Sequence, residues 1–458
     1  MPWREGDLAQ AEENAQKLFA PVVGESHVLT EEAAGAAYGI DGKTPKCVVL
    51  PSSVEEVAVV LRLCAEHNLA VVAMRQGTKL GLGNPPRRYD VALSLKEMTR
   101  VWNYEAGDLT IVVEPGMKLG DFQRYIGRDN LWLPLDPFGG AKASLGGIMA
   151  TNAAGPLRLF YGTPRDMVLG LKFATPDGKV IKTGGRVVKN VAGYDLGKLL
   201  IGSLGTLGVI VEASFKLYPK LAERATFMMP TGTLGIARDL RRRIQASPLQ
   251  PLRLVLLDSA AATYVRADSG LAPEAKEPEI WIEVGGSPRV IERCASDLEQ
   301  LGRAVGSKLE RVVDKDAETV WDRISDFPAA LGATYPGLII LRAGLPRAGG
   351  EEFLSRAQQE AEGEKVRLAS FGQTGVGTVY LCLLEYADGL GIPALVGRLR
   401  QAAEGLGGTV VVERCPSEFK QGVDVWGPAG DDFDTMRQVK ALWDPKGILA
   451  PGRFIGGL

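Results

Sequence analysis

The chain has 458 residues, of which 45% are hydrophobic and 24% are charged, as in ordinary globular proteins. This length exceeds what one hydrophobic core usually organises, so we expect two large domains. The 53 basic and 55 acidic residues leave a net charge of -2, which excludes a global positive field for binding nucleic acid or an anionic membrane. A bound phosphate must therefore be held locally, by backbone amides and a few side chains.

Cysteine and histidine usage restricts the metal chemistry open to the chain. Its five cysteines form no C-x-x-C pair, so the sequence predicts neither a zinc site nor an iron–sulfur cluster. The only histidines are His27 and His67, and we expect His67 to close the C-terminal end of a helix, where a positive charge suits the helix dipole. No metal site is predicted.

The N-terminus is polar, and no segment has the length and hydrophobicity of a membrane span. Scattered cysteines without a secretory leader also indicate a reducing compartment. The sequence therefore predicts a cytoplasmic protein that is at most peripherally associated with the inner face of a membrane.

From about residue 45 to 220 the expected elements follow an α+β pattern. The segment 52–68 is predicted to be a helix, because Ser53 and Glu56 form a capping box and apolar residues recur with helical spacing. The segment 167–185 is predicted to be a hairpin that turns at residues 176–178. A further helix is expected near 118–126, and strands are expected at 46–51, 69–74, 90–95, 109–115 and 205–219.

After Pro219 strands alternate with amphipathic helices, in two rounds of strand–helix–strand that predict an α+β layer. We expect a first domain at 1–220, a second at 221–430, and a C-terminal helix and tail at 431–458 that return to the first domain. The expected strands of the second domain are 252–258, 279–286, 337–346, 377–385 and 408–415, and its helices are 289–304 and 393–406.

Glycine is concentrated in three loops of the first domain, at 75–83, 139–147 and 202–210. Glycine lets successive backbone amides point one way and lets the backbone approach a ligand closely, so such loops can bind a pyrophosphate. Each loop taken alone is equally well explained as a tight turn between strands. No P-loop string is present, and GLGNPP at 81–86 cannot open the helix of an NAD-binding Rossmann turn.

Three strings carry a more specific signal: RQGTKLGLGNPP (75–86), PLDPFGGAKASLGGIMATNAAGPLRLFYGTPRD (134–166) and KNVAGYDLGKLLIGSLGTLGVI (189–210). In this order they resemble the PCMH-type FAD-binding domain of the vanillyl-alcohol-oxidase family, and within it the FAD-binding subunits of bacterial glycolate oxidases. VDVWG (423–427) and DPKGILAPGRF (444–454) resemble the C-terminal part of the same proteins. The resemblance implies an FAD-binding domain of two α/β subdomains, followed by an α+β ferredoxin-like cap domain.

Carried over by position, the resemblance implies which residues contact FAD. The loop 75–81 would wrap the pyrophosphate, Asp136 and the turn 144–147 would line the diphosphate and isoalloxazine side, and the segment 205–210 would lie against the adenine or the flavin ring. Thr78 stands where covalent-flavin relatives carry a histidine, so we expect non-covalent FAD. The implied contacts are Arg75, Gln76, Gly77, Thr78, Lys79, Leu80, Gly81, Asp136, Ser144, Leu145, Gly146, Gly147, Thr151, Asn152, Gly205, Thr206, Gly208, Val209 and Ile210.

The chain departs from the family pattern at three positions near these loops. Arg75 and Gln76 stand where the family usually has glycine, and Leu204 replaces an expected acidic residue. A non-Gly residue forced to positive φ costs on the order of 1 kcal/mol, which would reshape the loop or reduce its affinity for FAD. The charge of Arg75 near the phosphates would offset this cost.

The expected cap lacks the metal ligands of related stand-alone enzymes that oxidise D-2-hydroxy acids. Those relatives carry a His pair in an H-x-G-D-G-N-type string, whereas the matching stretch 371–381, FGQTGVGTVYL, has no His, Asp or Glu. Oxidation of a 2-hydroxy acid needs a cation that binds the carboxylate near the flavin. Arg342 is the candidate for this catalytic role; the alternative is a solvated arginine at a strand end. Lys189, Tyr194 and Glu413 are further polar candidates, and no general base is assigned.

Three functions remain open on the sequence alone. The first is the FAD-binding subunit of a glycolate oxidase-like 2-hydroxy-acid dehydrogenase complex. In it a sister FAD subunit would bear the metal site, and a separate iron–sulfur subunit would take the electrons. The missing cap histidines suggest that the sister subunit does the substrate chemistry, with this chain as an electron-relay or structural flavin subunit; family membership alone does not distinguish this role from oxidation by the chain itself. The second is a self-sufficient FAD-dependent oxidoreductase of another alcohol or hydroxy acid. The third is a flavin-free assembly subunit, which Arg75 and Gln76 keep open.

Overall fold

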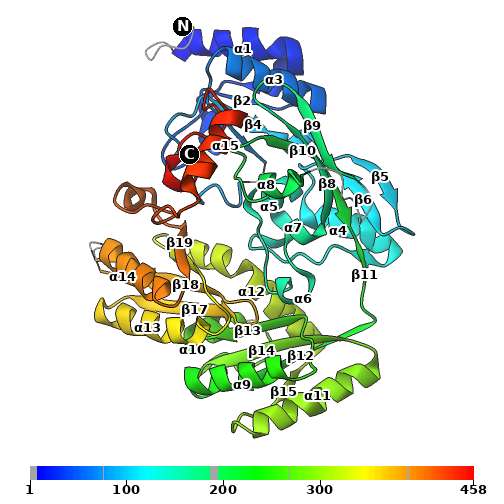
Figure 1. Ribbon diagram of the computed structural model, residues 1–458, viewed down its shortest axis with the longest axis vertical. Helices are drawn as coiled ribbons and strands as arrows, with labels where there is room; N and C mark the ends of the chain where they lie inside the picture. The colour runs from blue at the N-terminus through cyan, green and yellow to red at the C-terminus, as the bar shows by residue number, and fades with distance from the viewer. Residues whose placement is uncertain (1–7, 76, 186–193, 268, 388, 390) are drawn as a thin grey trace.

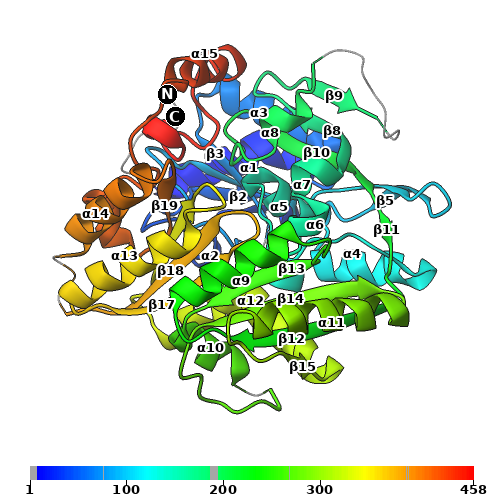
Figure 2. The same ribbon diagram turned by 60° about the horizontal axis from the view of Figure 1, so that its bottom comes forward.

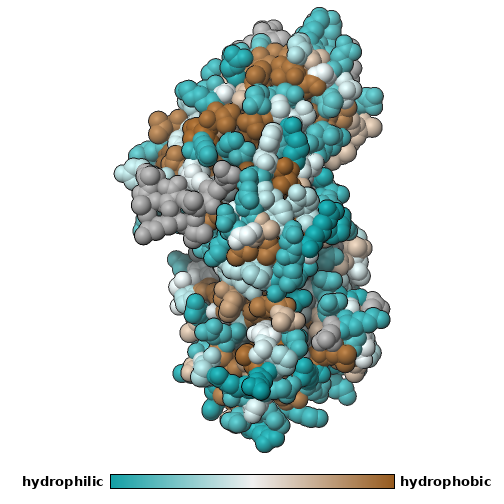
Figure 3. All heavy atoms as spheres, turned by 90° about the vertical axis from the view of Figure 1, so that its right-hand side faces the viewer, coloured by the Kyte–Doolittle hydropathy of each residue, from teal (hydrophilic) through white to brown (hydrophobic). Residues whose placement is uncertain are grey.

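The structure is a computed structural model that describes residues 8–75, 77–185, 194–267, 269–387, 389 and 391–458. Two lobes follow one another along its longest axis, and the first contains both ends of the chain (Figure 1). Seen from the side, the molecule narrows between the lobes and exposes apolar side chains in several separate groups (Figure 3). The α+β fold class predicted from the sequence is confirmed.

A four-stranded sheet forms one part of the first lobe, in the order β1–β2–β4–β3. β2, β4 and β3 run parallel, and β1 is antiparallel at the edge. α3 packs on this sheet through Val57, Val60, Leu61 and Cys64, the apolar residues whose spacing predicts the helix. The elements of this part are α1 (Leu8–Val23), β1 (Val28–Leu29), α2 (Glu32–Ala37), β2 (Cys47–Val49), α3 (Val54–Glu66), β3 (Val71–Met74) and β4 (Val91–Ser94).

The ends of α3 agree with the sequence in most respects. Ser53 Oγ accepts a hydrogen bond from the Glu56 backbone N–H at 3.2 Å, as a capping box requires. A capping box also expects the Glu56 carboxylate to accept from the backbone N–H of Ser53. The carboxylate accepts instead from the backbone N–H of the preceding residue, Ser52, at 2.7 Å. His67 is the C-cap residue, as predicted.

A five-stranded antiparallel sheet forms the other part of the first lobe, in the order β5–β6–β10–β8–β9. β10 is its central strand and is buried along most of its length. β8 and β9 form the predicted hairpin, in which Gly178 has a φ of 78°. The elements are β5 (Val101–Glu105), β6 (Thr110–Val113), α4 (Leu119–Ile126), β7 (Leu131–Trp132), α5 (Leu145–Thr151), α6 (Arg158–Tyr161), α7 (Pro164–Met167), β8 (Val168–Ala174), β9 (Val180–Gly184), α8 (Gly197–Leu200), β10 (Val209–Lys216) and β11 (Tyr218–Pro219).

The second lobe is one antiparallel sheet of eight strands, in the order β15–β12–β14–β13–β17–β18–β16–β19. It consists of two ferredoxin-like units that join edge to edge through β13 and β17. α9, α11, α13 and α14 cover one face (Figure 2), and α10 and α12 pack on the other. The elements are β12 (Glu223–Pro230), α9 (Leu234–Ala246), β13 (Arg253–Leu257), α10 (Ser259–Arg266), β14 (Glu279–Gly286), α11 (Pro288–Arg303), β15 (Glu310–Val312), α12 (Asp314–Thr334), β16 (Ile339–Gly344), α13 (Gly350–Gly363), β17 (Arg367–Gln373), β18 (Thr378–Glu385), α14 (Ile392–Glu404) and β19 (Thr409–Arg414).

The C-terminal segment packs on the first lobe. α15 (Phe433–Trp443) ends with Trp443, whose ring stacks on Phe173 of β8 with 5.5 Å between the centroids. Beyond the helix, the backbone N–H of Val71 in β3 donates to the carbonyl of Ile448 at 2.8 Å. The last residues of the chain therefore lie beside the parallel sheet that the N-terminal residues form.

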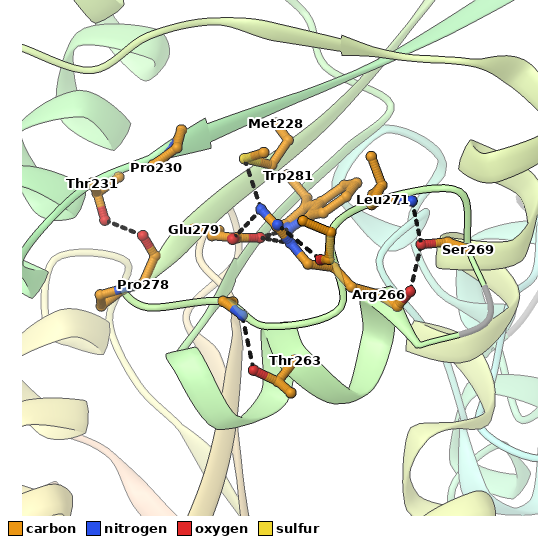
Figure 4. A network of polar contacts seen from close by, with 12 residues as sticks. Met228, Pro230, Thr231, Thr263, Arg266, Ser269, Leu271, Pro278, Glu279 and Trp281 are labelled. Carbon is orange, nitrogen blue, oxygen red and sulfur yellow. Dashed lines mark hydrogen bonds and ion pairs between the residues drawn. The ribbon is translucent and has the colours of Figure 1, made fainter.

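A buried ion pair stabilises one end of the second-lobe sheet (Figure 4). Arg266 at the end of α10 pairs with Glu279 at the start of β14. The Glu279 carboxylate also accepts from Trp281 Nε1 at 3.0 Å, and the guanidinium contacts Met228 Sδ at 3.7 Å. Burial raises the pKa of Glu279, and Arg266 opposes this rise without cancelling it. Each of the two buried charges therefore depends on the other.

Replacing Arg266 with Met is expected to lower the free energy of unfolding by about 3–5 kcal/mol, because it leaves the Glu279 carboxylate buried without a cation. Urea denaturation measures the change. The double variant Arg266→Met, Glu279→Gln removes both charges and keeps an acceptor for Trp281, so it should recover a large part of the loss. A single variant as stable as the parent would contradict the assignment of an ionised Glu279.

Candidate functional site

A cavity lies between the two sheets of the first lobe. The end of β3 and the residues that follow β4 and β6 form one side, and α5 with the loop before β10 forms the other. All three glycine-rich segments, or the residues at their ends, reach this cavity. The predicted FAD contacts that line it are Arg75, Ser144, Gly146, Gly147, Gly205, Gly208, Val209 and Ile210.

The backbone of the cavity wall needs glycine at specific positions. A Cβ at Gly146 would lie 2.8 Å from Pro115 Cβ, so no side chain fits there. Gly205 has a φ of 74°, and a Cβ added to it would meet no atom within 4 Å. Leu204 has a φ of 54°, a conformation that costs a non-Gly residue about 1–2 kcal/mol. Strain of this kind concentrates at ligand sites. A glycine-lined wall with one cation, Arg75, fits the predicted role in holding FAD.

The loop 77–81 is fixed from outside the cavity by two buried cations. Lys420 Nζ donates to the carbonyl of Gly81 at 2.7 Å, and Arg453 Nη2 donates to the carbonyl of Leu80 at 2.7 Å. Both cations come from the last 40 or so residues of the chain. The C-terminal segment therefore determines the conformation of a loop that is more than three hundred residues away in sequence.

Residues 77–81 do not line the cavity, and their contact with FAD stays a prediction. A Cβ at Gly139 would lie 3.3 Å from Thr78 Cβ, and Lys79 reaches the second lobe. Arg75 is not among the described residues with positive φ, so the backbone strain suggested by the sequence does not arise there. Gln76 lies outside the described residues.

Four other predicted contacts do not line the cavity, and three of their side chains have structural partners. Leu145 is fully buried in the hydrophobic core. Thr151 Oγ1 donates to the carbonyl of Gly147 at 2.8 Å, and Thr206 Oγ1 donates to that of Ser203 at 2.7 Å. Asn152 closes α5 in a left-handed conformation with a φ of 47°. The structure does not bring these four side chains to the cavity, because the sequence motif marks the backbone path and not the direction of each side chain.

Asp136 does not line the cavity, and its predicted contact with FAD stays a prediction. Its carboxylate accepts from the backbone N–H of Leu157 at 3.1 Å and pairs with Arg253 Nε of β13 at 3.1 Å. Arg253 also pairs with Glu283 of β14 at 3.1 Å. Because its oxygens are committed to these partners, Asp136 joins the two lobes and does not line the cavity.

The ion pair of Asp136 predicts a pH dependence of stability. Burial raises the pKa of Asp136 to about 6, against the opposing effects of Arg253 and Leu157. Between about pH 4 and 6, Asp136 is protonated in the folded chain but ionised in the unfolded chain. Protonation of Asp136 therefore stabilises the fold at low pH, and this stabilisation is lost as the pH rises through the pKa of the folded state. Relative to Asp136→Asn, which cannot ionise, the parent should lose up to about 3 kcal/mol between about pH 4 and 7. The free energies of unfolding of both proteins are measured by urea denaturation across this pH range. The same pH dependence in the parent and in Asp136→Asn would contradict the prediction.

A second polar site lies where the lobes meet. Glu413 of β19 accepts from Arg342 Nε of β16 at 2.7 Å and pairs with Lys79 Nζ of the first lobe at 3.3 Å. Burial alone would raise the pKa of Glu413, but Lys79 and Arg342 outweigh it and lower the pKa. Burial would likewise lower the pKa of Arg342, and Glu413 reverses this shift. Glu413 and Arg342 therefore stabilise one another's charged forms. Arg342 lies at the interface of the lobes, with 32% of its side chain exposed.

Cross-strand pairing places further side chains on the face that carries Arg342. Arg342 is the direct partner of Tyr380 on β18, and such partners point to the same side of a sheet. Thr378, two residues before Tyr380, accepts a hydrogen bond from Arg158 Nη1 of the first lobe at 3.3 Å. The ring of Phe138 lies edge-on to Tyr380 at 4.6 Å. Arginines from both lobes therefore meet over one face of the cap sheet.

Sequence reasoning missed two members of this polar site. Arg158 lies on the short helix α6 and has no distinguishing pattern around it, and Tyr380 looks like a core residue of an apolar strand. Glu413 was a polar candidate without a geometric reason, which the ion pairs now supply. Tyr194 is 94% exposed, and Lys189 lies outside the described residues.

Within the described ranges, no group of three or more His, Cys, Asp or Glu side chains is arranged to hold a metal ion. The stretch that matches the metal-binding string of relatives carries Gln373 and Thr374 instead. Both are buried, and their side-chain polar atoms have no hydrogen-bond partner in the described part of the chain. None of the described helices has the length and apolar character of a membrane span.

Comparison with known proteins identifies both lobes. Residues 45–184 match the family model of the FAD binding domain, and residues 220–413 and 425–454 match that of the C-terminal domain of FAD linked oxidases. The chain is 28% identical over 419 residues to glycolate oxidase subunit GlcD of Bacillus subtilis, covering 90% of this chain and 89% of that protein. It is 30% identical over 415 residues to a D-lactate dehydrogenase of Archaeoglobus fulgidus, covering 89% and 91%. The resemblance found in the sequence is confirmed.

Solved structures share the arrangement of the two lobes. p-Cresol methylhydroxylase with substrate bound superimposes with a TM-score of 0.78 at 18% identity, over 97% of both chains. 4-Ethylphenol oxidase from Gulosibacter chungangensis superimposes with a TM-score of 0.75 at 17% identity, over 98% of both chains. At these identities the likeness concerns the fold alone.

Proposed function

Since the chain belongs to the family of FAD-linked oxidases and is an FAD-dependent oxidoreductase, we propose that it is the FAD-binding subunit of a glycolate oxidase-like complex that oxidises a small 2-hydroxy acid. The observation that carries the proposal is the meeting of Arg342 and Arg158 with Tyr380 between the lobes. An arginine binds a carboxylate through two parallel hydrogen bonds. Relatives named for glycolate and D-lactate support a hydroxy acid as the substrate.

The residues of the chain divide the work as follows. Bound FAD supplies the acceptor for the hydride that leaves the α-carbon. Arg342 holds the substrate carboxylate, and its ion pair with Glu413 fixes the direction of the guanidinium. Burial raises the pKa of Tyr380, so its hydroxyl keeps its proton and donates a hydrogen bond to the substrate oxygen. The proton that this oxygen loses is released to water, which reaches the partly exposed Arg342 side of the site. Lys79 neutralises Glu413 from the first lobe and so joins the FAD loop to the substrate site.

The electrons leave, in this proposal, through a separate iron–sulfur subunit. The sequence has no C-x-x-C pair that suggests a cluster of its own, and the relative in Bacillus subtilis is named as a subunit. A sister FAD subunit would carry the metal site, because the stretch 371–381 lacks the expected ligands. A cytoplasmic location, with at most peripheral membrane association, is part of the same proposal.

A self-sufficient dehydrogenase is the second candidate. It is favoured by the match to the D-lactate dehydrogenase of Archaeoglobus fulgidus, which extends over 91% of that protein. The two candidates differ in whether the isolated chain completes a turnover. The substrate-binding role of Arg342 is the same in both.

Anaerobic addition of glycolate or D-lactate to the FAD-loaded chain, followed by a redox dye, separates these candidates. The same assay is run on the complex that a tag on this chain isolates from its source cells. Reduction of the flavin only in the complex is the expected result. Repeated turnover by the isolated chain would favour the self-sufficient enzyme. Failure of every 2-hydroxy acid to reduce the flavin in both preparations would contradict the proposed function.

A further inference from the structure

The polar site between the lobes carries more positive than negative charge. Among the described residues its cations are Lys79, Arg158 and Arg342, and the carboxylate of Glu413 pairs with Lys79 and Arg342. Glu413 is shared by Lys79 and Arg342, so one negative charge serves two cations. This leaves a surplus of two positive charges at a place where both lobes restrict access of water.

Arg158 contributes one of the two surplus charges. Its hydrogen bond goes to the neutral hydroxyl of Thr378 at 3.3 Å. Burial lowers the pKa of Arg158, and the neighbouring charge of Arg342 lowers it further. Tyr380 and, less strongly, Asp166 oppose this shift without cancelling it. No carboxylate of the described residues forms an ion pair with Arg158. Two arginines that repel one another in a partly buried site are stabilised when anionic groups bind between them.

The cap sheet leaves room beside Arg342 for such groups. Gly344, two residues after Arg342, pairs with Thr378 on one side and Thr409 on the other. A Cβ added to Gly344 would meet only Thr409 Oγ1, at 3.9 Å. The next residue across the sheet from Thr378 is Gln373, which is buried and has neither side-chain polar atom hydrogen-bonded in the described part of the chain. Gly344, Thr378 and Gln373 lie in one row across three neighbouring strands. In this row Gly344 leaves open space for a bound group, and the side-chain amide of Gln373 has no hydrogen-bond partner among the described residues.

We propose that the substrate carries two carboxylates and is a 2-hydroxy dicarboxylic acid. This proposal rests on the proposed oxidation of a 2-hydroxy acid at the same site. Arg342 holds the carboxylate next to the hydroxyl-bearing carbon. Arg158 holds the second carboxylate over Gly344, beside the Thr378 hydroxyl that accepts its hydrogen bond. Two carboxylates neutralise both surplus charges, whereas a monocarboxylate such as glycolate neutralises one.

Binding of non-oxidisable acids tests this proposal independently of turnover. The FAD-loaded chain is titrated with malonate, succinate and glutarate, and with acetate, propionate and butyrate, while the visible flavin spectrum reports binding. The best dicarboxylate is expected to bind at least about tenfold more tightly than any of the monocarboxylates, which corresponds to about 1.4 kcal/mol. Arg158→Met should remove this preference and change monocarboxylate binding less than about twofold, and Arg158→Lys should retain part of it. Arg165→Met, an exposed arginine of the same segment, is the matched control and should retain it fully.

The other outcomes separate this proposal from the proposed function. Equal weakening of both classes of acid by Arg158→Met would overturn the assignment of a second carboxylate subsite. Dicarboxylates that bind no more tightly than monocarboxylates would also overturn it, and oxidation of glycolate or lactate would then leave the proposed function intact. A clear dicarboxylate preference without oxidation of any 2-hydroxy acid would support the subsite and contradict the proposed function.

Discussion

Substitution of Gly205 with Asn is expected to weaken FAD binding about tenfold to a hundredfold while the chain still folds, since overpacking costs about 1–3 kcal/mol. Gly205 lines the cavity with a φ of 74°, and its Cβ position opens into free space. Asn tolerates this left-handed conformation better than other side chains do. Its side chain would therefore enter the space that FAD occupies without distorting the backbone. FAD titration of the apoprotein, followed by flavin fluorescence, measures the change.

The matched control for this variant is Gly306→Asn in the second lobe. Gly306 has a φ of 76° and an equally open Cβ position, but it lies outside the cavity. The control should bind FAD like the parent, and acid precipitation should release the flavin of both into solution, because attachment is predicted to be non-covalent. Undiminished FAD binding by Gly205→Asn would mean that FAD lies elsewhere.

Substitution of Arg342 with Met is expected to lower kcat/KM for the 2-hydroxy acid by at least about thirtyfold, because loss of a buried charge-assisted contact costs about 2 kcal/mol or more. Arg342 does not line the FAD cavity, so the affinity for FAD should remain that of the parent. The measurement is the rate of flavin reduction as a function of substrate concentration. A raised KM with an unchanged limiting rate would indicate that Arg342 binds the ground state and transition state equally.

Two further variants distinguish substrate binding from structural support. Arg342→Met leaves Glu413 with one cation fewer and should also lower the free energy of unfolding. Arg342→Lys keeps a charge for Glu413 but cannot form two parallel hydrogen bonds to a carboxylate, so compared with Arg342→Met it should recover stability more fully than activity. Arg347→Met changes an exposed arginine just beyond the same strand and should leave both unchanged. Full activity in Arg342→Met would exclude Arg342 as the carboxylate ligand.

Local signals in the sequence were sufficient for most elements of the fold. The helical spacing of Val57, Val60, Leu61 and Cys64 predicts α3, because one apolar face must be buried against a sheet. The turn at residues 176–178 predicts the β8–β9 hairpin for a similarly local reason. The doubling of the ferredoxin-like unit was visible only as repeated alternation, because the β13–β17 contact joins segments more than a hundred residues apart.

The site was predictable to different extents in its two parts. The glycine-rich segments identify the cavity, since close approach of backbone to a ligand requires glycine and leaves a mark in the sequence. The ion pair of Asp136 could not be predicted, because a motif cannot show that Arg253, from the other lobe, takes its carboxylate. The support of the loop 77–81 by Lys420 and Arg453 was equally hidden, because both cations come from the C-terminal segment.

The sequence by itself determined the family, the cofactor and the α+β architecture, because each depends on residues that are close together in the chain. The tertiary structure alone decided which charges meet between the lobes. Lys79, Arg158, Arg342 and Glu413 come from four separate segments. The sequence offered Lys79, Arg342 and Glu413 as separate candidates, but nothing in it shows that they meet or that Arg158 joins them. A charge acquires its chemical role from its burial and from the partners that folding brings within a few ångströms, and these are set by the packing of the two lobes.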